Sequence, residues 1–395
     1  MYIKSLQTSL FVVGILATSG SLCLCNAFIL PSRSFVKFEL KAVSLIDDTF
    51  VAPDTKAAGI SEQACADAAA KMQRINVPVP ESVSDSGSVG VSFINWKPET
   101  PKKGSLPLLL VHGFDSSCLE YRRLGPKLAA LGIDTYAVDL LGWGYSQLDG
   151  VNTFSAQAKV EALAGFWDAV GQGRDVCVAG ASLGGAAAIE FSAGNPKVKA
   201  CVFIDAQGFV DGVGPMAKLP KFLAQAGVKV LKSEALRNSA NNMSYFDKES
   251  FATEDALKVG RLHCLREGWD DALVSFMLDG GFYPSEKVAK IEAPSLILWG
   301  RQDTILEIEF ASKFLDTLPD ASLQWIENCG HVPHLEQPDE TAQAISTFLS
   351  SDKFESAVDE ISSTEDNING PILVAGSLAG VALVGTAAAT VLGSI

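Results

Sequence analysis

Residues 180–184 place a serine where a nucleophile would be needed. The sequence there is Gly-Ala-Ser-Leu-Gly, so Gly180 and Gly184 flank Ser182. An apolar run, residues 176–179, precedes this pentapeptide, and an Ala-rich segment follows it. Glycines let a strand and a helix approach closely, and the serine between them takes a strained backbone that lifts its hydroxyl clear of the sheet. The pattern therefore predicts a sharp strand-to-helix turn with Ser182 as the nucleophile.

A serine hydroxyl needs a base and an orienting acid before it becomes a good nucleophile. Asp303 follows the apolar run 295–299, and His331 follows the run 323–326. The carboxyl ends of parallel strands meet at one edge of an open sheet, and this is where such sheets build their sites. We therefore predict that His331 takes the serine proton and that Asp303 fixes the tautomer of its imidazole.

Two other residues compete for the roles of base and acid. His334, three residues beyond the predicted base, is the alternative base. Asp205 closes the candidate strand 200–204 and is the alternative acid, because a carboxylate after that strand can also reach the base. The other two histidines have different expected places: His263 in a helix, and His112 in a loop that it holds by hydrogen bonds.

The oxyanion that forms when a serine attacks a carbonyl needs two N–H donors. One is expected to be the backbone N–H of Leu183, the residue after the serine. The other is expected from Phe114, because the apolar run 108–111 breaks into His-Gly-Phe and its glycine lets the loop fold over the serine. No candidate strand is followed by G-x-G-x-x-G or G-x-x-x-x-G-K, so we expect no nucleotide cofactor. We also expect that the serine mechanism uses no metal.

These residues lie among apolar runs that alternate with helical segments, which is typical of an α/β fold. Several runs are short and continuous in Val, Leu and Ile, like strands buried on both faces of a parallel sheet. The candidate strands are residues 89–96, 106–111, 134–138, 176–179, 200–204, 295–299 and 323–326. Before them, the pattern predicts an Ala-rich helix over residues 59–75 and a linker over 77–87.

Five motifs occur in one order along the chain: His-Gly-Phe at 112–114, Asp-x-x-Gly-x-Gly-x-Ser at 139–146, Gly-Ala-Ser-Leu-Gly-Gly at 180–185, Gly-x-x-Asp at 300–303 and Gly-His-Val-Pro-His at 330–334. With them, residues 89–349 resemble the α/β-hydrolase superfamily, and segments 114–146 and 260–265 look like the chloroplast members from plants. The resemblance implies a mostly parallel eight-stranded sheet flanked by helices. It also implies a helical cap inserted after the sixth strand, here at about 208–283. Epoxide hydrolases and haloalkane dehalogenases share this plan but carry an aspartate where this chain has Ser182.

Together these features predict a serine hydrolase that cleaves a carboxylic ester through an acyl-enzyme. The alternatives are a ligand-binding or receptor-type protein that keeps the triad, and an acyltransferase that uses the same acyl-enzyme. A hydrophobic or lipid-like ester is expected if cap aromatics face the serine, although most of them should lie in the core of the cap. The cap side chains concerned are Phe222, Phe246, Phe251, Trp269, Phe276, Met277, Phe282 and Tyr283.

The composition excludes some classes of partner. The 395 residues include 31 Lys and Arg against 46 Asp and Glu, for a net charge of −15. Such a chain repels phosphate backbones, and no basic run is interleaved with aromatic residues, so no nucleic-acid partner is expected. The eight cysteines form no C-x-x-C pair and are predicted to be reduced and mostly buried.

Both ends of the chain are predicted to lie outside the domain. Residues 1–27 have the layout of a signal peptide. The segment that follows is rich in serine and basic residues, so residues 1–45 resemble the two-part plastid presequence of algae with complex plastids, in which Phe28 follows the cleavage point. Secretion is the alternative location. A helix and linker are expected over residues 46–88.

At the other end, residues 350–370 form an acidic tether and residues 371–395 carry no charge. A helix of 25 residues is long enough to cross a bilayer, at about 1.5 Å per residue against roughly 30 Å. We therefore expect this segment to anchor the protein to a membrane. The alternatives are a flexible tail and a cleaved lipid-anchor signal.

Overall fold

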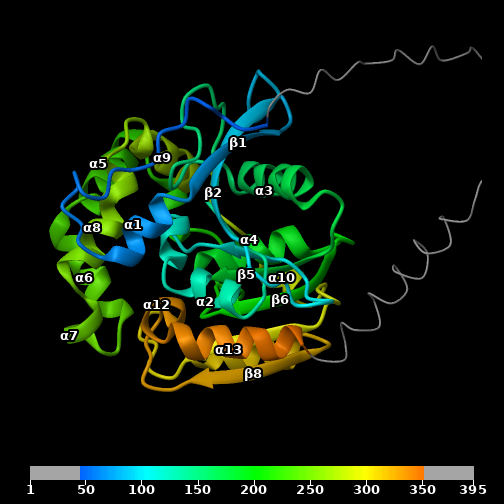
Figure 1. Ribbon diagram of the computed structural model, residues 1–395. Coiled ribbons are helices and arrows are strands. Elements are labelled where there is room, and N and C mark those ends of the chain that lie inside the picture. Colours follow the sequence, from blue (N-terminus) through cyan, green and yellow to red (C-terminus); the bar gives the residue numbers. More distant parts are fainter. Residues whose placement is uncertain (1–44, 351–395) are drawn as a thin grey trace, which may run out of the picture. The chain divides into compact units, whose positions relative to one another are not determined.

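An open eight-stranded sheet runs through residues 45–350, the part of the chain that the computed structural model describes (Figure 1). The strand order is β1-β2-β4-β3-β5-β6-β7-β8. β1 and β2 pair antiparallel, as do β2 and β4, and all other pairs are parallel. The strands are β1 Met72–Pro78, β2 Ser88–Trp96, β3 Leu108–Val111, β4 Thr135–Val138, β5 Val176–Ala181, β6 Val198–Ile204, β7 Ser295–Gly300 and β8 Ala321–Ile326. The predicted fold class is confirmed.

The sheet begins earlier than the sequence analysis predicted. Strands β2 to β8 match the seven predicted runs within a few residues, but β1 lies where a helix to residue 75 and a linker from residue 77 were expected. The helix prediction holds for Gln63–Ala69 but was wrong from residue 72, because β1 is only partly buried: Met72, Ile75 and Val77 are buried, while the residues between them are partly or fully exposed. Pro78 is tolerated because β1 is an edge strand that pairs only with β2 in the sheet.

Side chains alternate between two hydrophobic layers, one on each face of the sheet. In β3, Leu109 and Val111 pack with helices α3, α4 and α11. Leu108 and Leu110 point to the opposite face and pack with α1, α2 and α13. All four residues of β3 are fully buried, as expected for a central strand covered on both faces.

Thirteen helices are present within residues 45–350. Those that cover the sheet are α1 Gln63–Ala69, α2 Leu124–Ala130, α3 Ala156–Gly171, α4 Leu183–Ser192, α10 Ser285–Val288, α11 Glu309–Thr317, α12 Pro333–Glu336 and α13 Pro338–Leu349. None of the helices in this part of the chain is long and apolar enough to cross a membrane.

The insertion between β6 and β7 forms the cap, in the position that the resemblance implied. Its helices gather on one side of the sheet, at the left of Figure 1. They are α5 Lys221–Leu231, α6 Glu234–Ser244, α7 Lys248–Phe251, α8 Glu254–Leu262 and α9 Trp269–Asp279, with 3-10 turns η2 Gly214–Lys218 and η3 His263–Leu265. The N-terminal segment contacts the cap, since Ser61 donates from its backbone N–H (2.9 Å) and hydroxyl (2.7 Å) to Asp255.

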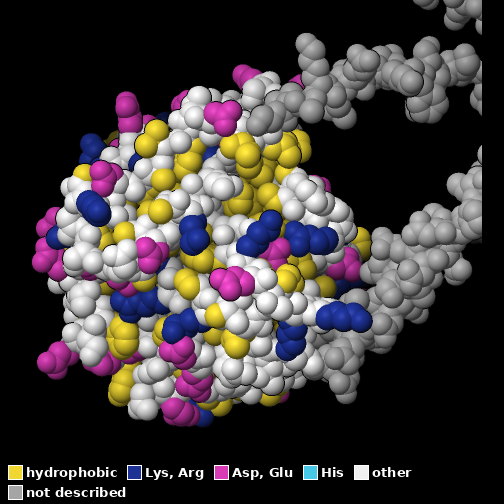
Figure 2. Space-filling view, viewed as in Figure 1, with side chains coloured by type: hydrophobic (Ala, Val, Ile, Leu, Met, Phe, Trp, Pro, Cys, Tyr) yellow, Lys and Arg dark blue, Asp and Glu magenta, His cyan; other side chains and the backbone are white. Residues whose placement is uncertain are grey.

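Neither the charged surface in view nor the state of the cysteines contradicts what the composition predicted. On the face shown in Figure 2, Lys and Arg side chains lie interspersed with Asp and Glu side chains. The six cysteines within residues 45–350 are all buried and free. Residues 1–44 and 351–395, which include the predicted presequence, most of the acidic tether and the predicted anchor, lie outside the described residues.

Candidate active site

Ser182 lies in a sharp turn between β5 and α4. Its φ of 50° and ψ of −125° fall in a region that non-glycine residues rarely adopt. The close approach needs its glycines: a Cβ on Gly180 would lie 2.3 Å from the Gly184 carbonyl oxygen, and one on Gly184 would lie 2.2 Å from the Val111 oxygen. The structure thus has the strained strand-to-helix turn that the sequence predicted.

Asp303 and His331 meet in the loops that follow β7 and β8. His331 Nδ1 lies 2.8 Å from Asp303 Oδ2, and both side chains are buried. The other carboxylate oxygen of Asp303 accepts the backbone N–H groups of Ile305 at 2.7 Å and Leu306 at 3.2 Å. Burial alone would raise the pKa of Asp303, but the hydrogen bond and charge of His331 outweigh it and lower the pKa. Asp303 is therefore an ionised acceptor that orients the imidazole.

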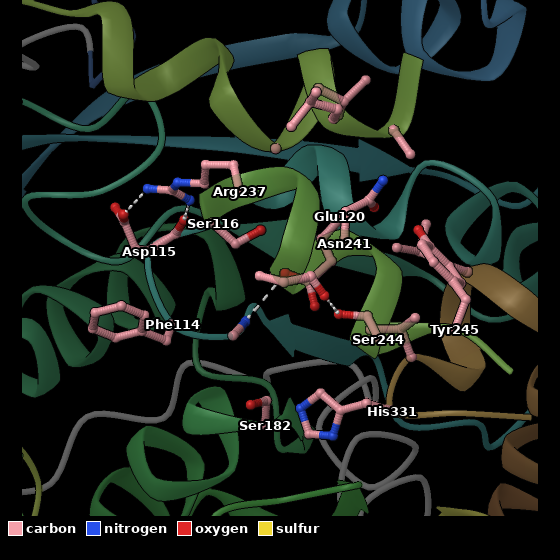
Figure 3. A pocket seen from close by; sticks show the side chains of 18 of the residues that line it. Phe114, Asp115, Ser116, Glu120, Ser182, Arg237, Asn241, Ser244, Tyr245 and His331 are labelled. Carbon is pink, nitrogen blue, oxygen red and sulfur yellow. Dashed lines mark hydrogen bonds and ion pairs between the residues drawn. The ribbon is translucent and has the colours of Figure 1, made fainter. Parts of the chain in front are cut away.

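Ser182 and His331 line the same cavity, and Figure 3 shows their side chains next to each other below the cap residues. The Ser182 hydroxyl donates no hydrogen bond to any group within residues 45–350. Hydrogen bonds between a nucleophile and its base often form only when substrate is bound. The elements thus bring the three predicted residues together at the carboxyl ends of β5, β7 and β8.

Asp205 lies beside this pair but holds a different position. Its Oδ1 accepts the backbone N–H of Gly300 at 3.0 Å, and the carboxylates of Asp205 and Asp303 lie within 4.8 Å of the imidazole and of each other. Burial and the neighbouring charge of Asp303 raise the pKa of Asp205 well above its usual value. These effects favour the protonated form of Asp205, whereas Asp303, whose pKa is lowered, is the carboxylate that contacts His331 Nδ1.

His334 does not face the cavity. It is fully buried in α12, where its Nε2 lies 2.8 Å from Glu120 Oε1 and its ring lies 5.1 Å from that of Tyr121. Burial alone would raise the pKa of Glu120, but the bond and charge of His334 lower it to about 2. The contact with an ionised carboxylate gives His334 a structural place and leaves His331 as the histidine beside Ser182.

The loop after β3 passes directly over the serine. A Cβ on Gly113 would lie 3.3 Å from Cβ of Ser182. His112 fixes this loop as predicted: its Nδ1 bonds the Gly113 carbonyl oxygen at 2.9 Å, and its Nε2 accepts the N–H of Leu140 at 3.1 Å. Burial lowers the pKa of His112, which suits this neutral tautomer.

The predicted oxyanion donors remain free for a ligand. The N–H of Gly113 is already used, since it donates to Glu120 at 3.3 Å. The backbone N–H groups of Phe114 and Leu183 have no acceptor within the part of the chain that the structure describes. Leu183 begins helix α4, where the dipole also favours a developing negative charge. These two donors are therefore available for an oxyanion on a substrate attached to Ser182.

The cavity at Ser182 has a volume of about 320 Å³ and is lined by both polar and apolar side chains. None of the eight cap side chains proposed from the sequence lines it; Trp269, Phe276, Met277 and Phe282 are buried in the core instead. The polar side chains that line it are Asp115, Ser116, Ser117, Glu120, Arg122, Arg237, Asn241 and Ser244. Its apolar side chains are Phe114, Ala240, Tyr245, Ala256, Leu257, Val259, Ile305, Val332 and Leu335.

The sequence analysis missed the cap residues of this lining. Arg237, Asn241 and Ser244 recur at helical spacing along α6, so they share one face of that helix. A stripe of polar and small residues in a predicted cap helix was the signal available. The sequence alone did not show that this face would turn toward the serine.

Within residues 45–350, two clusters have donor atoms that are close enough for a metal ion. One is Asp205, Asp303 and His331, the group just described, and the other is Asp115, His263 and Cys264. In the second cluster Arg237 already forms an ion pair with the Asp115 carboxylate. A guanidinium at that position repels a cation, so this cluster does not fit a metal ion.

A serine at a strand-to-helix turn, a histidine–carboxylate pair and an open, mostly parallel sheet define the class of α/β hydrolases. A family model described as the alpha/beta hydrolase family matches residues 108–344. The chain belongs to this family.

Comparison with known proteins adds three relatives. The alpha/beta hydrolase domain-containing protein VTE7 of Arabidopsis thaliana is 37% identical over 286 residues, which cover 72% of this chain and 86% of VTE7. Lipase 1 of Psychrobacter immobilis is 28% identical over 253 residues, or 62% of this chain and 77% of the lipase. The solved structure of a thermophilic esterase from Thermogutta terrifontis matches with a TM-score of 0.57 and 21% identity, covering 70% and 98% of the two chains. At this low identity, the match to the esterase structure shows a similar fold and nothing more.

Proposed function

We propose that this protein is a serine hydrolase that cleaves a carboxylic ester through an acyl-enzyme on Ser182, without a metal or cofactor. The observation that carries the proposal is the 2.8 Å contact between His331 Nδ1 and the ionised Asp303, in a cavity that also contains the strained Ser182. An imidazole with its Nδ1 proton held by a carboxylate offers Nε2 as a base. A relative named as a lipase supports ester hydrolysis.

The proposed reaction has two halves. In the first, His331 Nε2 takes the proton of Ser182 as its oxygen attacks the ester carbonyl, and the N–H groups of Phe114 and Leu183 stabilise the oxyanion. The C–O bond to the alcohol then breaks, and His331 returns the proton to the leaving oxygen. In the second half, water gives a proton to His331 and attacks the acyl-enzyme. The acid leaves, and Ser182 regains its proton.

We propose a small hydrophobic ester as substrate, one that also carries a polar group. The apolar side chains of the cavity, such as Leu257 and Ile305, suit an acyl or alkyl chain. Across the cavity, Glu120 and Asn241 offer oxygens that accept hydrogen bonds from a hydroxyl or amide. An ester that combines both features fills the cavity without leaving its polar atoms unpaired.

A fluorophosphonate probe and an ester panel test the proposal on the purified full chain. The wild-type protein should be labelled and should release acid from activated esters, and Ser182→Ala should do neither. Equal labelling of both proteins would refute the role of Ser182. Ligand-induced thermal stabilisation without turnover would indicate the binding protein instead. Product formation only in the presence of an added alcohol would indicate the acyltransferase.

We also propose a location at a plastid membrane, on the basis of the sequence of the two ends. The presequence composition of residues 1–45 supports the plastid, and the uncharged residues 371–395 support attachment to a membrane. Fractionation after an alkaline carbonate wash should retain the full chain in membranes and release a chain ending at Gly370. Equal release of both would refute the anchor, and accumulation in the culture medium would indicate secretion.

A further inference from the structure

Asp115 directly follows Phe114, the residue proposed to supply an oxyanion donor, and its carboxylate is buried between the sheet and the cap. Three cap side chains reach it. Arg237 of α6 forms an ion pair with Oδ2, while His263 Nε2 of η3 and Trp269 Nε1 of α9 lie 3.0 Å and 2.8 Å from Oδ1. We call these three side chains the cap latch. Figure 3 shows Arg237 extending to Asp115 beside Phe114.

The cap latch also holds the backbone of Asp115. Its φ of 46° is in the left-handed region, which aspartate tolerates better than most residues with a side chain. Arg237 donates through Nη1 to the Asp115 carbonyl oxygen at 3.3 Å as well as to the carboxylate. A glycine would take this φ more easily but could not make the contacts of the Asp115 carboxylate.

The two sides of the Phe114 peptide are therefore anchored to different parts of the molecule. On its N-terminal side, His112 and Gly113 are bonded to the core through Leu140 and Glu120. On its C-terminal side, Asp115 is bonded only to the cap through its side chain. The N–H of Phe114 lies between these anchors, so its position depends on where the cap holds Asp115.

A second contact runs in parallel through aromatic rings. The ring of Phe114 lies 5.5 Å from that of Trp143, in an edge-to-face arrangement. Trp143 in turn lies 5.0 Å from Phe276 of α9, in the cap. The cap thus reaches Asp115 directly by charge, and Phe114 indirectly by packing through Trp143.

The charges at the latch fit this arrangement. Burial opposes ionisation of Asp115, but the hydrogen bond and charge of His263 and the charge of Arg237 lower its pKa to about 2. Burial likewise opposes protonation of His263, but Cys264 and Asp115 raise its pKa to about 9. At neutral pH the carboxylate is therefore ionised and faces two cations.

Resting on the proposed function, we propose that Asp115 is a positioning residue that couples the cap to the oxyanion hole. With the latch closed, Phe114 N–H is held where negative charge develops on the substrate. With the latch broken, the Phe114 N–H moves away from this position. The transition state then loses a hydrogen bond to its oxyanion, a bond that the bound substrate does not make in the ground state. The coupling therefore changes kcat and leaves KM nearly unchanged.

Asp115→Asn is the variant that tests this proposal, because it keeps the size and the tolerance of positive φ but removes the charge. Asp115→Gly keeps the backbone conformation and removes the latch entirely. Asp255→Asn is the matched control, since Asp255 joins the cap to Ser61 at 2.7 Å but does not touch the loop over Ser182. Thermal unfolding of each full-length variant shows whether it is folded.

With p-nitrophenyl butyrate as substrate, Asp115→Asn and Asp115→Gly should lower kcat by about tenfold to a hundredfold, less than the loss of a whole oxyanion donor. KM should change by less than about threefold. A trifluoromethyl ketone, which forms a tetrahedral oxyanion on the serine, should bind more weakly by the same factor as kcat/KM falls. Asp255→Asn should leave all three values unchanged.

Hydrogen exchange of residues 112–117 provides a readout that does not need activity. Exchange in this loop should accelerate in Asp115→Asn and stay at the wild-type rate in Asp255→Asn. Unchanged exchange, an increase of KM alone, or an equal loss of kcat in Asp255→Asn would overturn the proposal. The wild type could also neither react with the fluorophosphonate nor turn over esters, while exchange still accelerates in Asp115→Asn. That result would support the contact between the cap latch and the loop but would refute the proposed function.

Discussion

Replacing Asp303 by asparagine tests the assignment of the acid more sharply than removing it. Asp303 Oδ1 accepts two backbone N–H groups, from Ile305 and Leu306, while Oδ2 faces His331. An asparagine has one oxygen, and the two buried N–H groups need an acceptor, so that oxygen takes the place of Oδ1. Its NH₂ group then points at His331 Nδ1. The imidazole must accept at Nδ1 and carry its proton on Nε2, where it cannot receive the proton of Ser182.

The expected loss follows from this change of tautomer. In known triads the same replacement lowers kcat by about 10⁴, which is about 5 kcal/mol of the activation free energy. Asp205→Asn is the matched control. The raised pKa of Asp205 favours its protonated form, which an asparagine resembles in charge, and an asparagine can keep the bond from the Gly300 N–H. We expect its kcat to stay within about threefold of wild type.

The assay is kcat for an activated ester, measured between pH 6 and pH 9 for both variants, with circular dichroism to confirm that each is folded. A severe loss in Asp205→Asn together with near-normal turnover in Asp303→Asn would refute the reasoning. It would move the orienting carboxylate to the end of β6. Similar severe losses in both would show that the neutral neighbour is needed as well.

Three further predictions concern folding around the site. Gly184→Ala places a Cβ 2.2 Å from the Val111 carbonyl oxygen, so kcat should fall at least tenfold, whereas Gly227→Ala, with open space around it, should leave ester turnover unchanged. Glu62→Gln removes the charge from two arginine ion pairs and should cost about 2 kcal/mol of unfolding free energy at pH 7. Burial opposes ionisation of Glu62, but the arginines lower its pKa below 4.5. This difference, measured in urea, should therefore shrink as the pH falls from 4.5 through the lowered pKa of the folded state. Burial lowers the pKa of Lys159 from 10.5 to about 7, so its amine loses its proton on folding. Relative to Lys159→Met, the wild type should therefore gain unfolding free energy as the pH rises from 7 to 10.5, and a constant difference would contradict this.

The strands and the serine turn could be predicted because their signals are local. A central strand such as β3 is apolar along its whole length, and Gly180 and Gly184 report a backbone approach that no other residue allows. β1 was missed because only part of it is buried, and Gln73 and Arg74 interrupt its apolar pattern. An edge strand gains its partner from tertiary structure, and the local sequence carries little record of it.

For the carboxylate that orients His331, the sequence predicted Asp303 but left Asp205 as the alternative. Asp205 and Asp303 both follow parallel strands, and both carboxylates lie within 4.8 Å of the His331 imidazole. What separates them is the loop after β7, which turns so that two N–H groups bond Asp303, while Asp205 receives one from Gly300. Such turns depend on the packing of the loops against each other, which the spacing of motifs does not record.

None of the cap side chains named from the sequence lines the cavity, and several lie in the core as the sequence analysis expected for most of them, which bears on the substrate. A cap is a layer of helices that must bury one apolar face to stay on the domain. Here Trp269 and Phe276 of α9 form that apolar face. Their rings pack in the hydrophobic core, so they do not line the cavity. The face left toward Ser182 is the polar side of α6, with Arg237 and Asn241. Because a partly buried polar wall penalises a ligand that covers it without bonding to it, a purely aliphatic ester should be a poorer substrate than one that carries a hydroxyl or amide near the reacting carbonyl.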